Sequence, residues 1–149
     1  MSIVVLIATL GAGLGLSAGL AFNLRLSKSL GTPLAATMVN FIVGASLLLL
    51  LWSVGLEGTR PTAWPPLWMM LGGVFGSAYV TLSVFGATRL GVGVSTVAAT
   101  LGQVLGAVVI SSAGWFGQQP QLPSWTTIAS AALLIGAVVL LSQDREHSK

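Results

Sequence analysis

Hydrophobic residues fill five long runs, which short segments rich in glycine and proline separate. The runs are Ile3 to Leu24, Leu34 to Leu56, Leu67 to Thr88, Val92 to Ala113, and Trp125 to Ser142. Each run comes close to the length of about 20 residues that an α-helix needs to cross a hydrocarbon core about 30 Å thick. The pattern therefore predicts an all-α membrane protein with five transmembrane helices, forming one domain over residues 1–149.

The segments between the runs contain residues that end or start helices. They are Gly31-Thr32-Pro33, then Thr59 to Pro66 with three prolines, Arg89-Leu90-Gly91, and Gly114 to Pro123. Glycine commonly follows a helix, and proline commonly stands at the start of the next one. Because the third segment is so short, we expect the helices on either side of it to be antiparallel neighbours.

Composition supports a membrane protein and argues against an enzyme. The chain has 149 residues, a mean hydropathy of +0.94, 6% charged residues and no cysteine. The carboxylates Glu57, Asp144 and Glu146 and the lone His147 are all expected outside the membrane. No nucleophile has a base beside it, and no cluster of metal ligands exists. We therefore expect no catalysis, no cofactor and no metal, and the scattered basic residues do not predict nucleic-acid binding.

The first run could be mistaken for a secretory signal peptide, since Gly19-Leu20-Ala21 loosely fits a cleavage site. No basic residue precedes the run, as a signal peptide would require. We therefore interpret it as a retained helix.

The charged residues predict an orientation in the membrane. With five crossings, one side holds Arg25, Lys28, Arg89, Arg145 and Lys149, and the other side holds Arg60 alone. Cytoplasmic loops carry an excess of Lys and Arg, so the N-terminus is expected outside and the C-terminus in the cytoplasm. All five tryptophans fall at helix ends or loops on the side of Arg60, which is typical of an interfacial belt: Trp52, Trp64, Trp68, Trp115 and Trp125.

The third run contains the only tyrosine of the chain, near its middle. At helical spacing Tyr79 shares one face with small residues, namely Gly72, Gly76, Ser83 and Gly86. Tyrosine in a membrane helix usually lies at the headgroup level. At mid-membrane its hydroxyl needs a protein partner or a water-filled cavity. Tyr79 is thus either a packing residue bonded to another helix or part of a solute path at the depth where transporters place their sites.

Other polar residues inside the predicted helices include Asn23, Asn40, Thr100 and Gln103. An amide in hydrocarbon is costly unless it is hydrogen-bonded, so Asn40 and Gln103 should face the interior of a helix bundle, where they bond either each other or a solute. The expected substrate path consists of Asn23, Asn40, Tyr79, Ser83, Thr100 and Gln103.

Small residues also recur at spacings that allow close helix packing. Gly11, Gly15 and Gly19 form a ridge on the first helix, and comparable positions are Gly72, Gly76, Gly102 and Gly106. Glycine at every fourth residue lets another backbone approach closely. We expect these seven residues to serve helix packing.

Several segments of the chain form recognisable motifs: GGVFGSAYVTLS at residues 72–83, NLRL at 23–26, LGTPLAA at 30–36, NFIVG at 40–44, RLGV at 89–92, Gly102-Gln103 and GWFG at 114–117. Together they resemble the YdcZ-like inner-membrane exporters, a branch of the drug/metabolite transporter (DMT) superfamily. The resemblance extends through nearly the whole chain, and residues 72–83 are its most specific part. The chain departs from the family pattern at Gly19, where glutamine is usual, and at Ser111 and Ser112, where an acid and a histidine are usual.

The resemblance implies a bacterial inner-membrane protein that forms one half of an inverted-repeat transporter. Larger members of the superfamily look like two five-helix units inserted in opposite senses, so the chain is expected to dimerise. The partner is either a second copy or a homologous five-helix chain of opposite orientation. The uneven Lys and Arg count favours the homologous chain, because a chain that inserts both ways needs nearly balanced charges.

Two classes of function remain open at this stage. The first is a subunit of a small-solute exporter that works by alternating access and takes a neutral or weakly polar solute, since no acid lies within the membrane. The second is an interaction or regulatory subunit that transports nothing and uses its glycine ridges for docking.

Overall fold

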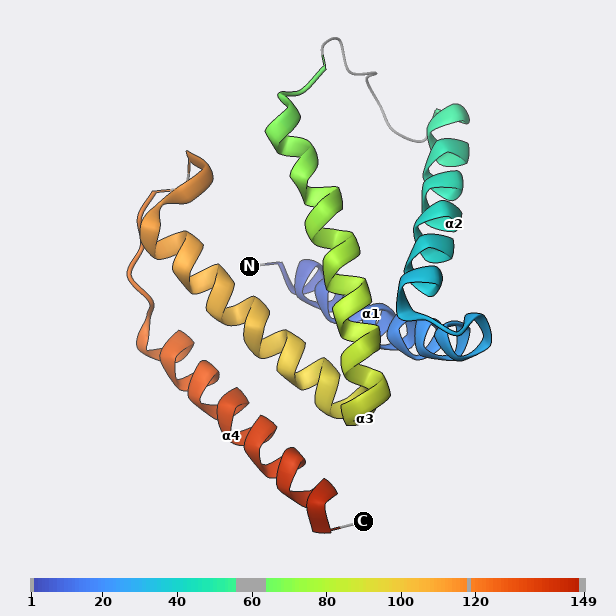
Figure 1. Ribbon diagram of the computed structural model, residues 1–149. Helices are drawn as coiled ribbons and strands as arrows, with labels where there is room; N and C mark the ends of the chain where they lie inside the picture. The colour runs from blue at the N-terminus through green and yellow to red at the C-terminus, as the bar shows by residue number, and fades with distance from the viewer. Residues whose placement is uncertain (1, 56–63, 118, 148–149) are drawn as a thin grey trace. The chain divides into compact units, whose positions relative to one another are not determined.

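The computed structural model describes residues 2–55, 64–117 and 119–147, and every regular element in these ranges is helical (Figure 1). The elements are α1 (Ile3–Leu30), α2 (Pro33–Ser53), the 3-10 helix η1 (Leu67–Met70), α3 (Leu71–Ala113), the 3-10 helix η2 (Trp115–Gly117) and α4 (Trp125–His147). Four helical stretches, η1 together with α3 counting as one, are long and apolar enough to cross a membrane. The prediction of an all-α membrane protein is confirmed.

Local residues explain the break between α1 and α2. Gly31 has a left-handed backbone with φ 83°, which glycine adopts without the steric cost that a Cβ would add. Thr32 caps α2, because its hydroxyl oxygen accepts a hydrogen bond of 3.1 Å from the backbone N–H of Ala35, and Pro33 occupies the first turn. The break predicted at Gly31-Thr32-Pro33 is therefore confirmed.

Helix ends differ from the predicted ends of the apolar runs. α1 continues from Leu24 to Leu30 and α4 from Ser142 to His147, because a helix can extend beyond the part that hydrocarbon covers. α2 ends earlier, at Ser53. The predicted end at Leu56, most of the break at 59–66, and Glu57 and Arg60 lie outside the described residues.

The helix α3 is interrupted at Gly91. This residue has φ 74° and ψ 165°, a combination outside the helical region that is essentially restricted to glycine. The helical segments on either side are residues 71–90 and 92–113. They match the two helices that the sequence predicts at 67–88 and 92–113, and η1 supplies the first turn of the former. Four membrane-competent helices are described, so the number of five crossings stays a prediction.

The chain divides into two compact units, Met1–Thr88 and Arg89–Lys149. In the first unit α1 packs against α2. The most buried side chains of this unit come from the end of α1, the start of α2 and the last turns before Thr88: Ser27, Ala36, Thr37, Val84 and Ala87. The packed part of the unit thus lies at the end that contains the α1–α2 connection.

In the second unit a loop closes the end of α3. The carbonyl oxygen of Ser111 accepts hydrogen bonds from the backbone N–H of Gly114, at 3.4 Å, and of Gln121, at 2.9 Å. Ser124 then caps α4, since its hydroxyl oxygen accepts from the N–H of Thr127 at 3.3 Å. The loop predicted at Gly114 to Pro123 is confirmed, with Gln118 outside the described residues.

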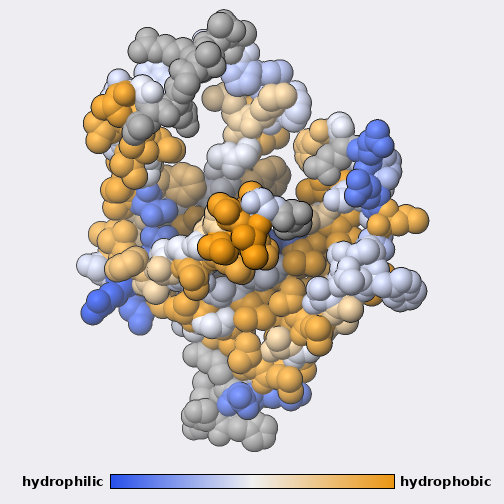
Figure 2. Space-filling model, turned by 180° about the vertical axis from the view of Figure 1, so that it is seen from behind, coloured by the Kyte–Doolittle hydropathy of each residue, from blue (hydrophilic) through white to orange (hydrophobic). Residues whose placement is uncertain are grey.

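Apolar side chains cover much of the surface that Figure 2 presents. Large residues in the middle of helices are exposed, among them Leu14 in α1, Leu49 in α2 and Phe75 in α3. A water-soluble monomer rarely exposes apolar patches of this extent. These faces require lipid or another helix to cover them.

Candidate functional site

The six residues predicted for the substrate path are divided between the two units. Asn23 lies on α1, Asn40 on α2, and Tyr79 and Ser83 on α3, all in the first unit. Thr100 and Gln103 lie on α3 in the second unit. The first unit therefore holds the larger part of the candidate site, with contributions from three helices.

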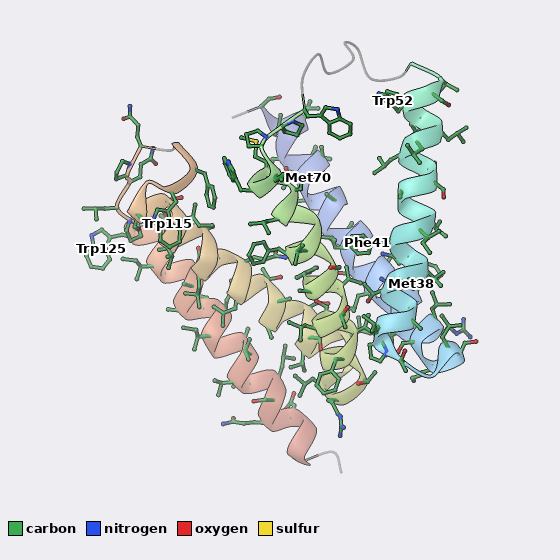
Figure 3. All side chains as sticks on the ribbon, turned by 45° about the horizontal axis from the view of Figure 1, so that its top comes forward. Met38, Phe41, Trp52, Met70, Trp115 and Trp125 are labelled. Atoms are coloured by element: carbon green, nitrogen blue, oxygen red, sulfur yellow. The ribbon has the colours of Figure 1, made fainter. Side chains whose placement is uncertain are left out.

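Two contacts set the register between α2 and α3 in the first unit. The hydroxyl of Thr81 lies 3.0 Å from the hydroxyl oxygen of Thr37. Four residues further along α2, the ring of Phe41 lies 3.5 Å from the position that a Cβ on Gly76 would occupy. Figure 3 shows Phe41 pointing from α2 toward α3. From the first contact to the second, the residue number rises on α2, from Thr37 to Phe41, and falls on α3, from Thr81 to Gly76. The two helices are therefore antiparallel.

This register places Asn40 and Tyr79 at similar depth on facing helices. Asn40 directly precedes Phe41, and Tyr79 lies between the two contact residues Gly76 and Thr81. The side chain of Asn40 is exposed, and that of Tyr79 is 36% exposed. An exposed amide in an apolar helix needs hydrogen bonds from water, a solute or another chain. Asn40 and Tyr79 are thus available to such a partner.

The stripe that contains Tyr79 lies beside the α2–α3 contact and not within it. At about 100° of rotation per residue, Ser83 is turned roughly a quarter turn, and Tyr79 roughly a third of a turn, from the direction midway between Gly76 and Thr81. Gly76 belongs to both the stripe and the contact. The printed contacts are Thr81 with Thr37 and Gly76 with Phe41. Ser83 therefore borders the contact with α2, and Tyr79 lies further around the helix.

The pair Thr37–Thr81 is the polar feature that the sequence did not reveal. Thr37 shares a face with Asn40 and Gly44, but a pattern on one helix does not show which hydroxyl of another helix lies opposite. Thr81 is two residues from both Tyr79 and Ser83, which places it on the opposite side of the helix from the predicted stripe, and it is separated from Thr37 by 44 residues. Only the paired arrangement of the two helices identifies it.

In the second unit two of the hydroxyls bond to their own helix. Thr96 donates to the carbonyl oxygen of Val92 at 2.8 Å, and Thr100 donates to that of Thr96 at 2.9 Å. The Thr100 oxygen can still accept a hydrogen bond, whereas its single hydrogen is already used. Gln103 is exposed and retains both donor and acceptor groups on its amide. Gln103 is thus the more versatile of the two predicted path residues.

Ser95 differs from its neighbours. Its side chain is only 6% exposed, and its hydroxyl oxygen has no hydrogen-bond partner. It lies on the stripe beside Thr96 and Thr100, next to Ala99 and Gly102 in the helical pattern. A buried hydroxyl without a partner loses free energy relative to one in water.

Most of the glycines predicted for helix packing have open space around them. A Cβ added at Gly11, Gly15, Gly19, Gly72, Gly102 or Gly106 would meet no atom within 4 Å. Gly76 is the exception in this set, because the ring of Phe41 covers it. The small-residue faces of α1 and of the second α3 segment are therefore open to a close approach by another helix.

Charged and aromatic residues lie at opposite ends of the first unit. Arg25 and Lys28 are in the last turns of α1, close to its connection with α2. Trp52 is at the far end of α2, and Trp68 is in η1, which adjoins the same end because α2 and α3 are antiparallel. Among the residues described, no group of three acidic, histidine or cysteine residues could hold a metal ion.

Residues 4–140 match the family described as "Putative inner membrane exporter, YdcZ". The chain belongs to this family. The match includes every segment that carries the resemblance noted in the sequence, from residues 23–26 to residues 114–117. The searches of curated proteins and of solved structures gave no significant match.

Membership of the YdcZ family agrees with the helices described above. Helices that are long and apolar enough to cross a bilayer make this chain a multi-pass inner-membrane protein of an exporter family. An exporter family suggests a transporter rather than an enzyme. The polar side chains within its helices are accordingly considered as contacts for a transported solute.

Proposed function

We propose that this YdcZ-family chain is one half of a small-solute exporter, with a path lined by Asn23, Asn40, Tyr79, Ser83, Thr100 and Gln103. The observation that supports this function best is the exposure of Asn40 and Gln103 on otherwise apolar helices. Lipid cannot satisfy an amide, so these groups call for a wet or solute-filled space. Because the chain belongs to an exporter family, we assign this space to a transported solute.

The residues of the path define the class of solute. Amides and hydroxyls both donate and accept hydrogen bonds, and the ring of Tyr79 offers an apolar face with a polar edge. None of the six residues carries a charge at neutral pH. The solute is therefore neutral or weakly polar, and small enough to pass between helices.

The chain crosses the membrane five times in this proposal. The break at Gly91 lets the segments 71–90 and 92–113 cross as two separate helices joined by a short turn. An odd number of crossings puts the termini on opposite sides. The excess of Lys and Arg at one side then orients the N-terminus outside and the C-terminus in the cytoplasm.

A second chain completes the transporter. Alternating access about a site at mid-membrane is most direct with two similar halves of opposite orientation. The partner is a homologous chain with the opposite charge bias, or a second copy of this chain. Asn40 and Tyr79 would hold the solute, and tilting of one half against the other would expose it to each side in turn.

Removal of single polar groups tests the path. A metabolite library is first screened for compounds that raise the melting temperature of the purified complex, and efflux of a stabilising compound is then followed in vesicles. Tyr79→Phe and Gln103→Leu should each reduce its apparent affinity about fivefold, the effect of losing one hydrogen bond worth about 1 kcal/mol. The control is Thr9→Val, because the Thr9 hydroxyl bonds only Val5 of its own helix.

Unchanged flux and affinity in both path variants would reject the assignment of these residues. Flux that is lost equally in the Thr9→Val control would indicate damage to the fold, since that residue is remote from the path.

A docking function is the second candidate, because the glycine ridge on α1 is open. Gly11, Gly15 and Gly19 have no neighbouring atom within 4 Å of an added Cβ. Such a ridge suits helix association in a membrane. A chain of this kind would stabilise another membrane protein and transport nothing. Flux by the purified complex, measured as above, separates this function from export.

A further inference from the structure

We propose that the exposed side of α1 binds an anionic phospholipid, whose phosphate is held by Arg25 and Lys28 and whose acyl chain lies along Phe22 and Leu14. None of these residues belongs to the proposed solute path. The lipid site therefore goes beyond the function proposed above and does not depend on the identity of the solute.

The two sides of α1 differ in burial over its C-terminal half. Ser27 is only 4% exposed, and Leu20 and Leu24, on the same side, are partly buried. At about 100° of rotation per residue, Phe22 lies about 140° and Arg25 about 160° from Ser27. Phe22 is 73% exposed, and Arg25 is exposed as well. One side of this half of α1 is thus packed, and the opposite side is open to lipid.

An apolar strip leads along the exposed side of α1 to Arg25. Leu14 is 74% exposed, and Ala18 and Phe22 follow it at intervals of four residues, both exposed. Residues four apart lie one above another on a helix, and Arg25 comes three residues after Phe22. An acyl chain that lies against this strip therefore brings its headgroup to the level of Arg25.

The length of α1 places its cations among the lipid headgroups. The helix has 28 residues and is about 42 Å long at about 1.5 Å per residue, whereas the hydrocarbon core is about 30 Å thick. Its residues are uncharged as far as Leu24, and Arg25 and Lys28 follow. The two cations therefore lie within about one turn of the end of the hydrocarbon, in the layer that contains the phosphates.

The positive charge at this end of α1 has no acidic counterpart nearby. Neither α1 nor α2 contains an aspartate or a glutamate. The structure gives neither Arg25 nor Lys28 a hydrogen bond or an ion pair with another of the residues it describes. Both side chains are exposed. Two cations at headgroup level are thus available to an anion of the bilayer.

The spacing of the two cations suits one phosphate group. Residues three apart are neighbours on a helix surface, so Arg25 and Lys28 can reach the same phosphate. The guanidinium of an arginine can bind two phosphate oxygens at once, and a lysine adds a compact charge. A zwitterionic headgroup also brings an ammonium, which these cations repel and which no acid on α1 or α2 attracts. The site therefore prefers an anionic lipid.

Quenching of a fluorophore beside the site tests this preference. The chain has no cysteine, so Ala21→Cys, one turn before Arg25 and exposed, gives a single label site. The full-length labelled chain is reconstituted in vesicles of phosphatidylglycerol and phosphatidylcholine in equal amounts, and either lipid carries a nitroxide quencher on its acyl chain. Both lipids are present in both leaflets, so the orientation of the chain does not affect the result.

The parent should associate with phosphatidylglycerol about thirtyfold more strongly than with phosphatidylcholine. Each cation near the surface contributes about fivefold, which corresponds to about 1 kcal/mol. Arg25→Gln and Lys28→Gln should each lower the preference about fivefold, and the double variant should abolish it. Arg25→Lys should retain most of it, because the charge stays. Sodium chloride at 1 M should weaken it, since the screening length falls to about 3 Å.

Arg89→Gln is the matched control, because it removes one cation from the second unit and should leave the preference at the label unchanged. A loss in this control equal to that in Arg25→Gln would overturn the site, since general surface charge would then explain the preference. Equal quenching by the two lipids in the parent, or a preference that persists in the double variant, would overturn it as well.

Two further outcomes reject a lipid as the occupant. If neither lipid quenches the label, another helix or chain covers this side of α1. If inorganic phosphate displaces the anionic lipid more than sodium chloride of the same ionic strength does, the cations take free phosphate. The measurement needs no solute, so its failure leaves the proposed export function untouched, and failure of the flux test leaves the lipid site untouched.

Discussion

Individual hydroxyl groups in this chain mostly satisfy their own helix. Ser46 donates to Ile42, Thr100 to Thr96 and Ser130 to Thr126, each over four residues. A hydroxyl bonded in this way can lie in an apolar environment without a second helix. Thr81 differs because it also reaches another helix. A polar side chain therefore indicates a functional position only where its own helix cannot supply all of its hydrogen-bond partners.

The effect of replacing a glycine on stability likewise differs between positions. Gly31 has φ 83°, whereas Gly13 is helical, and neither would bring an added Cβ within 4 Å of another atom. Gly31→Ala should destabilise the protein by about 1–2 kcal/mol, because the left-handed conformation strains any residue with a Cβ. Gly13→Ala should be neutral or slightly stabilising, since alanine favours the helix. Denaturant titration in lipid micelles measures both; equal effects would contradict the backbone explanation.

At the scale of helices, the interruption of α3 decides how the chain can be threaded through a membrane. A continuous helix over 71–113 would be much longer than a bilayer is thick, since about 20 residues suffice to cross it. The backbone at Gly91 divides this length into two segments that each suit one crossing. The proposed five crossings therefore depend on the non-helical backbone conformation of Gly91.

Gly91→Ala should therefore disturb insertion as well as stability. An alanine pays about 1–3 kcal/mol to keep this backbone conformation. A fraction of the chains should instead extend the helix and lose one crossing, which would move a C-terminal reporter to the opposite side. Gly93→Ala is the control, because Gly93 is helical and has open space around it. A reporter that stays on one side in both variants would show that Gly91 does not govern the crossing number.

The break between α1 and α2 could be predicted from the sequence, whereas the packed faces could not. Gly31, Thr32 and Pro33 act through their own backbone and neighbours, so a local pattern reveals them. The face of a helix that packs is different, because helices that are apolar on all sides show no amphipathic stripe. The sequence predicts a face of α3 that carries Tyr79, whereas the hydroxyl pair with α2 uses Thr81, which lies on another side of the helix.

At the scale of the whole molecule, one chain offers many exposed apolar faces and few polar ones. Lipid can cover the apolar faces, but it cannot satisfy the amides of Asn40 and Gln103. A second chain that covers these groups would convert two incomplete surfaces into one enclosed path. The open glycine ridge on α1 provides a further face on which such a chain could pack closely.

The orientation of the chain tests which partner it takes. Reporter tags at both termini should place the N-terminus outside and the C-terminus inside in nearly all molecules, because the proposed five crossings put five Lys and Arg residues at one side and one at the other. A fixed orientation calls for a homologous partner with the reverse bias. Equal populations of the two orientations would instead indicate an antiparallel pair of identical chains.

The separation of basic and tryptophan-rich ends in the first unit has an evolutionary consequence. Arg25 and Lys28 lie near the end of α1, and the polar groups within the helices, such as Asn40, carry no charge. A duplicated gene could thus reverse the way its product enters the bilayer by exchanging a few charged residues at helix ends, while the residues proposed to line the path stayed as they were. Topology and selectivity can diverge independently in such a lineage.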